Sequence, residues 1–133
     1  MLPLAGTGYK LVVPFRRMLD ELVAKAPGAR GAVFCDFEGE FVELVVRDPA
    51  LTDYDMKVYG AHMAAAWTNL QNGSEERGAG GIVEMRLGCD GGMLLCRSLR
   101  DGYYVVLLVQ SGTLSGPAAF ALEQTAAQMT TEL

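Results

Sequence analysis

Residues 27–39 read Pro27-Gly28-Ala29-Arg30-Gly31-Ala32-Val33-Phe34-Cys35-Asp36-Phe37-Glu38-Gly39. Pro27-Gly28 predicts the end of a helix, because proline cannot continue one and glycine readily takes the left-handed conformation after the last turn. The run from Ala32 to Cys35 is apolar without alternation, which predicts a strand buried on both faces. The four residues Asp36-Phe37-Glu38-Gly39 predict a tight hairpin turn. A helix, a buried strand and a hairpin are therefore expected to follow one another here.

The residues before this segment predict a first helix. Apolar side chains recur at spacings of three and four from Phe15 to Ala26, which gives the helix one apolar face. Proline is tolerated in a first turn, so the helix is expected to begin near residues 12–14. Residues 1–10 are then expected to form a loose N-terminal arm, and residues 11–133 a single domain.

Two further helices are expected downstream. Thr52 and Asp55 have the spacing of a capping box, which predicts a helix from residue 53 onward. Asn72-Gly73 is expected to end this helix, since glycine and asparagine favour the position after a last turn. The final helix is expected to start after Ser115, with proline in its first turn.

The remaining chain predicts strands joined by tight turns. Five strands are expected, over residues 30–37, 40–46, 81–88, 93–99 and 103–109. Asp90-Gly91 is a strong hairpin signal, and Asp101-Gly102 supplies another turn. The first and fifth strands are apolar throughout, so helices must cover both faces of the sheet. The expected fold class is α+β, an α/β sandwich ordered helix, two strands, helix, three strands, helix.

Composition narrows the function classes. The chain has 133 residues and a formal net charge of −5, which disfavours binding to nucleic acid or to an anionic membrane surface. No run of about twenty apolar residues occurs, and the N-terminus lacks the features of a signal peptide. Three cysteines without a Cys-x-x-Cys motif suit a reducing compartment, and each is expected to be a buried free thiol. A cytoplasmic protein is expected.

The sequence contains few candidate catalytic residues or motifs. No Gly-x-x-x-x-Gly-Lys motif is present, so the chain is not expected to bind nucleotide as a P-loop enzyme does. His62 is the single histidine and lies within a predicted helix, and Cys35 lies among apolar neighbours. Asp36 and Glu38 are better explained by hairpin geometry than by acid–base chemistry. We therefore expect no enzymatic activity, no cofactor and no metal site, since one histidine and three scattered cysteines do not make zinc-ligand spacing.

Three segments together resemble the Roadblock/dynein light-chain family, over about residues 11–133. They are residues 27–39, the helical segment Gly60-Ala61-His62-Met63-Ala64-Ala65-Ala66, and Leu99-Arg100-Asp101-Gly102-Tyr103-Tyr104-Val105-Val106. The resemblance implies a mainly antiparallel sheet in the order 2-1-5-4-3. It places the first and third helices on one face of the sheet and the second helix on the other.

The resemblance also implies a homodimer. In this arrangement the third strand pairs antiparallel with its twofold mate, and the second helices of the two copies pack together. Edge pairing would satisfy open backbone groups, and small side chains would allow the helices to approach closely. The interface residues expected on this basis are Ala61, Ala64, Ala65, Thr68, Ile82, Val83, Glu84, Met85 and Arg86.

Family resemblance further implies a partner. Members commonly bind Ras-like small GTPases, and a similar bacterial gliding-motility regulator activates its GTPase as a dimer. The expected function is therefore a non-catalytic homodimeric regulator or scaffold for such a GTPase, activating it by stabilising the GTPase's own active site. Tyr59, His62 and Trp67 are candidate partner-binding residues, and core packing is the alternative for Trp67. Two other functions stay open: a light-chain-type scaffold without a GTPase, and a small-ligand sensor.

Overall fold

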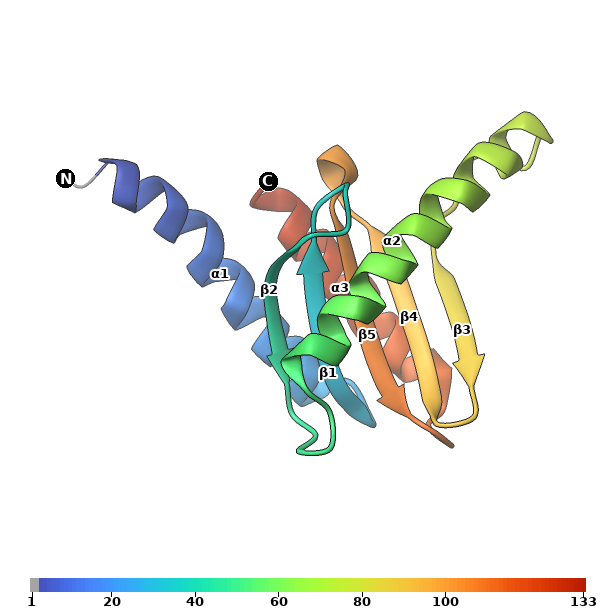
Figure 1. The fold of residues 1–133 in the computed structure, drawn as a ribbon, viewed down its shortest axis with the longest axis horizontal. Helices are drawn as coiled ribbons and strands as arrows, with labels where there is room; N and C mark the ends of the chain where they lie inside the picture. The colour runs from blue at the N-terminus through green and yellow to red at the C-terminus, as the bar shows by residue number, and fades with distance from the viewer. Residues whose placement is uncertain (1–2) are drawn as a thin grey trace.

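A five-stranded antiparallel sheet carries helices on both of its faces (Figure 1). The computed structural model describes the backbone of residues 3–133 and the side chains of residues 14–133. The elements are α1 (Pro3–Lys25), β1 (Ala29–Cys35), β2 (Phe41–Val46), α2 (Asp53–Glu76), β3 (Met85–Cys89), β4 (Gly92–Ser98), a short 3₁₀ turn (Arg100–Gly102), β5 (Tyr104–Gln110) and α3 (Ser115–Thr131).

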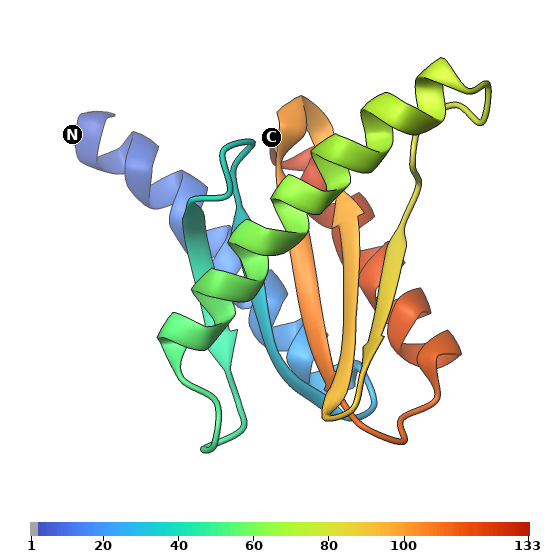
Figure 2. The ribbon, with the colours of Figure 1, turned by 45° about the vertical axis from the view of Figure 1, so that its right-hand side comes forward.

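The strand order is β2-β1-β5-β4-β3, and all neighbouring strands are antiparallel. α2 crosses one face of the sheet, while α1 and α3 lie side by side on the other (Figures 1 and 2). The predicted fold class, element order and distribution of the helices are therefore confirmed.

Two apolar cores lie on opposite sides of the sheet, because side chains along a strand alternate between its faces. Phe34 points toward α1 and α3, with its ring centroid 4.5 Å from that of Phe15 and 5.3 Å from that of Tyr103. Val33 and Cys35 point the other way, under α2. The unbroken apolar run in β1 thus fills both cores at once, as predicted.

The β1–β2 hairpin forms where the sequence predicts it. The Asp36 carboxylate accepts hydrogen bonds from the backbone N–H groups of Glu38 and Glu40 at 2.9 and 3.0 Å. Gly39 has φ +85°, a conformation that glycine adopts without strain. A Cβ atom at Gly39 would lie 3.1 Å from the Cα of Ala61, so the hairpin rests directly against α2.

The first helix is longer than expected. α1 begins at Pro3 and contains Pro14 in its interior, so the predicted start near residues 12–14 is wrong. The predicted loose arm does not hold for residues 3–10, and residues 1 and 2 lie outside the described part of the chain. An interior proline removes one helical hydrogen bond and strains the turn before it, but here it does not end the helix.

The segment after α2 also departs from expectation. α2 continues through Asn72-Gly73 to Glu76, because an interior glycine costs a helix only about 1 kcal/mol. β3 begins at Met85 instead of residue 81. Its predicted first residues do not pair with β4, and the Ile82 N–H donates to the Gln71 side-chain oxygen at 2.8 Å. The expectation that all three cysteines are buried is wrong for Cys89, which lies exposed at the end of β3.

The predicted capping box of α2 is confirmed. Thr52 Oγ1 accepts from the Asp55 N–H at 3.0 Å, and the Asp55 carboxylate accepts from the Thr52 N–H at 3.0 Å. This backbone hydrogen bond lowers the pKa of Asp55. The pKa of Asp48 is also lowered, first by the Ala50 N–H and then by Arg30, whose Nε lies 2.7 Å from the Asp48 carboxylate.

An Asp55→Asn variant is expected to melt below the wild type at neutral pH. A carboxyl whose folded pKa is depressed contributes stability that is present above its unfolded pKa and is lost as pH falls. The difference in Tm should therefore shrink as pH falls below about 4. Thermal melts from pH 7 to pH 2.5 test this, with Asp53→Asn in the same first turn as control. A Tm difference independent of pH would contradict the assigned role of Asp55.

Candidate protein-binding surface

α2 is held close to the sheet by a glycine and by large buried side chains. A Cβ atom at Gly60 would lie 3.0 Å from Val33 Cγ1, so this position brings the helix backbone onto β1. Met56, Met63 and Trp67 are buried on the same side of the helix. The opposite side of α2 is left facing outward.

The outward side of α2 carries small residues. Ala61 and Ala65 are exposed there. Thr68 is also exposed, but it lies at the border of this side, with its hydroxyl near that of Tyr104. Ala64 is only 3% exposed and belongs to the core under α2. Its assignment to the interface is therefore wrong, because each helical residue turns by about 100° and Ala64 points inward where Ala65 points outward.

The three candidate partner-binding residues have different environments. His62 is exposed on α2, and Tyr59 is half-buried against the core under the helix. Trp67 is 3% exposed and makes an edge contact with Tyr104, with 5.8 Å between ring centroids. Trp67 is thus a core residue, in agreement with the alternative of core packing, and His62 is the candidate on the free surface.

The β3 edge of the sheet is open, with large apolar side chains exposed beside the charged side chains of Glu84 and Arg86. Within the described chain β3 pairs only with β4, so its outer edge presents unpaired backbone groups. Large exposed apolar side chains gather near it: Val83 is 67% exposed, Leu87 50% and Leu70 54%. The C-terminal end of α2 extends beyond β3 (Figures 1 and 2). The surface formed by the outward side of α2 and by β3 is called the α2–β3 surface below.

The other edge of the sheet, at β2, is protected by charge. Glu43 on β2 forms a salt bridge with Arg16 of α1 at 3.1 Å. The Lys57 ammonium of α2 lies 4.2 Å from the centre of the Phe41 ring on the same strand. Charged side chains along an edge strand discourage pairing with another chain. Of the two edges, β3 is therefore the one suited to association.

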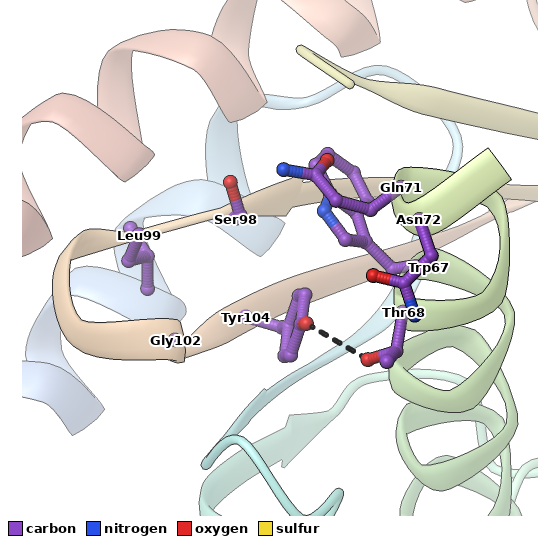
Figure 3. A pocket seen from close by; sticks show the side chains of 8 residues that line it. All are labelled: Trp67, Thr68, Gln71, Asn72, Ser98, Leu99, Gly102 and Tyr104. Carbon is purple, nitrogen blue, oxygen red and sulfur yellow. Dashed lines mark hydrogen bonds between the residues drawn. The ribbon is translucent and has the colours of Figure 1, made fainter. Parts of the chain in front are cut away.

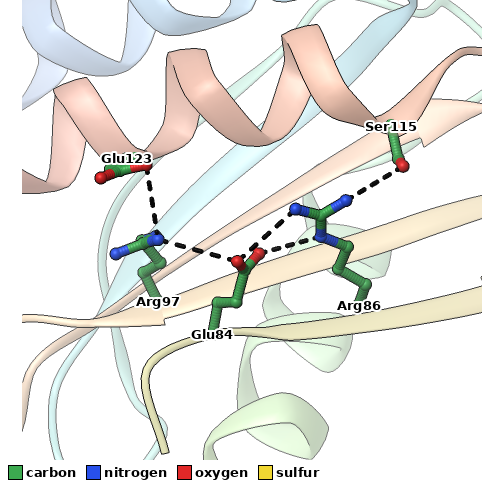
Figure 4. Close-up of polar contacts among 5 residues, drawn as sticks. All are labelled: Glu84, Arg86, Arg97, Ser115 and Glu123. Carbon is green, nitrogen blue, oxygen red and sulfur yellow. Dashed lines mark hydrogen bonds and ion pairs between the residues drawn. The ribbon is translucent and has the colours of Figure 1, made fainter.

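A polar network ties β3 to the rest of the domain on the face covered by α3 (Figure 4). The Arg86 Nε donates to Glu84 at 2.9 Å, and another Arg86 nitrogen donates to Ser115 Oγ at 3.1 Å. Arg97 on β4 lies 3.8 Å from Glu84 and 3.6 Å from Glu123 of α3. The hydrogen bond from Arg86 lowers the pKa of Glu84, so the charges persist at neutral pH.

A cavity of about 350 Å³ lies between the second half of α2 and the β4–β5 turn (Figure 3). Its lining includes the aromatic side chains of Trp67 and Tyr104 and the polar side chains of Gln71, Asn72 and Ser98. Thr68 Oγ1 lies 3.4 Å from the Tyr104 hydroxyl in its wall. Sequence reasoning missed this cavity, because the polar residues around it come from separate elements without shared spacing.

The geometry gives little support for chemistry at the two buried cysteines. Burial raises the pKa of Cys35 to about 12 and also raises the pKa of Cys96, so both remain protonated thiols at neutral pH. In the part of the chain that the structure describes, no group of three or more potential metal ligands lies together. Likewise, no helix within residues 3–133 has the length and apolar character needed to cross a membrane.

The sequence model of the Roadblock/LC7 domain matches residues 16–111. The chain belongs to the Roadblock/LC7 family. The match spans the strands β1 to β5 and the helix α2 between them, so it includes the whole α2–β3 surface. Membership of the Roadblock/LC7 family supports a regulatory or scaffold role. No curated protein sequence matches this chain.

Three solved structures share the fold. MglB in a tetrameric arrangement superposes with a TM-score of 0.82 at 15% identity, over 92% of this chain and 89% of that one. The gliding protein MglB from Thermus thermophilus has a TM-score of 0.79 at 15% identity, over 94% and 90% of the two chains. MglC from Myxococcus xanthus has a TM-score of 0.62 at 24% identity, over 90% of this chain and 98% of that one.

Proposed function

We propose that this chain is a homodimeric Roadblock/LC7 regulator or scaffold for a Ras-like small GTPase. The observation that carries the proposal is the α2–β3 surface. It combines an open strand edge bearing exposed apolar side chains with a helix side of small exposed residues, and α2 runs across the sheet toward this edge (Figure 1). An open edge of this kind is completed by a second strand, and a second copy of the chain supplies one.

Support for a GTPase partner comes from the family and from the sequence. The chain has no P-loop motif of its own, so a nucleotide-dependent role would be exerted on another protein. The neighbours named as gliding-motility MglB proteins share its fold. In the proposed mode the GTPase keeps its own catalytic residues, and the dimer holds them in their active arrangement.

Titration with a Ras-like small GTPase, chosen from the neighbouring genes where one is encoded there, tests the proposal. The GTPase is loaded with GDP or with a non-hydrolysable GTP analogue, and binding is followed by calorimetry. We expect at least about a tenfold difference in Kd between the two states, since couplings of about 5- to 150-fold are typical. A His62→Ala variant is expected to weaken binding, because His62 lies exposed on α2. Absence of binding in both nucleotide states would contradict a GTPase-directed role and favour a scaffold without a GTPase.

A further inference from the structure

The β3 edge restricts how two copies of this chain can pair, provided that they form the dimer proposed above. When a twofold axis perpendicular to the sheet relates the two copies, both α2 helices lie on one face of the combined sheet and both α3 helices lie on the other. Residues placed opposite each other in antiparallel strands point to the same face. Glu84 and Arg86 lie on the α3 side, while Met85 packs under α2. At the axis, one residue must therefore lie directly opposite the same residue of the partner. We describe such a register as having its axis at that residue.

Charge then distinguishes among the registers whose axis lies at one of residues 83–87. An axis at Glu84 places two Glu84 carboxylates opposite each other, and an axis at Arg86 does the same with two guanidinium groups. An axis at Leu87 places Glu84 opposite the partner's Asp90, and one at Val83 leaves Glu84 opposite an isoleucine. Like charges directly opposite each other destabilise a strand pair, whereas opposite charges stabilise it.

An axis at Met85 pairs both the charged and the apolar side chains. It places Glu84 opposite the partner's Arg86, and Arg86 opposite the partner's Glu84. It also places Val83 opposite the partner's Leu87. These two apolar side chains are 67% and 50% exposed in the single chain, so each would cover the other.

We propose that two copies of this chain pair through β3 with Met85 on the twofold axis, with Glu84 and Arg86 selecting this register. Residues 83 and 84, which do not pair with β4, then become part of the joined strand. The network from Glu123 through Arg97 to Glu84 and Arg86 continues across the axis into its copy. The charges select the register. The pair of Val83 with the partner's Leu87 and the backbone hydrogen bonds between the two strands stabilise the dimer.

Single cysteines test the register. Directly opposite residues have Cα atoms about 4.5–5.5 Å apart, within disulfide range. In a Cys89→Ser background, Met85→Cys is expected to form a disulfide-linked dimer under mild oxidation. Val83→Cys and Leu87→Cys are matched controls, because each would lie about 13 Å along the strand from its own copy. A mixture of these two variants is expected to cross-link. Non-reducing electrophoresis and intact mass give the readout.

The possible outcomes test the register and the existence of the dimer separately. Efficient cross-linking of Leu87→Cys or Val83→Cys alone would overturn the Met85 register while leaving the edge-paired dimer intact. A dimer by light scattering in which none of the variants cross-link would place the interface away from β3 and overturn the proposal. A wild-type protein that is monomeric by light scattering would contradict the proposed dimer itself.

A charge exchange gives a second measurement with little risk to folding, since both side chains are partly exposed. Glu84→Arg and Arg86→Glu are each expected to weaken self-association at least tenfold, because each places like charges opposite one another. Mixing the two variants is expected to restore a dimer of wild-type affinity. Unchanged self-association of both single variants would contradict selection of the register by these charges.

Discussion

Replacing Ala65 with arginine is expected to convert the proposed dimer into a monomer. Ala65 lies exposed on the outward side of α2, where the proposed dimer brings two helices together around small side chains. Two arginines at this position would put like charges into a close helix contact, which costs several kcal/mol. The dimer Kd should therefore rise by roughly 100-fold or more. Light scattering across a concentration series measures the change in molar mass.

A matched control comes from the opposite side of the domain. Ala127→Arg changes an exposed alanine on α3 and should leave the dimer mass unchanged. Circular dichroism should show both variants folded, because surface substitutions usually alter the unfolding free energy by less than about 0.5 kcal/mol. A dimer of wild-type mass for Ala65→Arg would show that α2 does not lie in the interface.

The second large effect is expected at Trp67. Truncation to alanine should lower the free energy of unfolding by about 3–5 kcal/mol, because the indole is buried against Tyr104 under α2. This is a large share of the roughly 5–15 kcal/mol that stabilises a typical domain. Urea denaturation followed by circular dichroism measures the loss. The partner-anchor alternative makes a different prediction, of unchanged stability with weakened partner binding.

Two variants control this measurement. Trp67→Phe retains an aromatic ring and should recover part of the lost stability. His62→Ala removes an exposed side chain from the same helix and should leave the unfolding free energy within about 0.5 kcal/mol of the wild type. If Trp67→Ala and His62→Ala had equal, small effects on stability, the core assignment of Trp67 would be wrong.

Local signals in the sequence predicted most of the fold. The capping box, the hairpin before Gly39 and the two-sided burial of β1 depend on neighbouring residues, and all three are confirmed. The limits of α1 and α2 were missed because Pro14 and Gly73 weaken a helix without ending it. Their cost is outweighed by the helical hydrogen bonds that continue on both sides.

The candidate surface was predicted less completely than the fold. The strand was expected from residue 81, but it begins at Met85, and the Ile82 N–H before it donates to the side chain of Gln71 on a distant helix. The sequence also showed three consecutive alanines without indicating which of them faces the sheet. That choice depends on the rotation of α2, which Gly60 and the buried Met63 determine by packing against β1 and its neighbours.

The close approach of Gly39 to Ala61 has a mechanical consequence. Helix and loop meet there backbone to backbone, without a side chain between them to absorb displacement. A ligand or protein that shifts the helix must therefore carry the loop with it or break the contact. Phe37 belongs to the same turn and is 66% exposed, so a displacement of the helix that carries the turn would also move an apolar side chain at the surface.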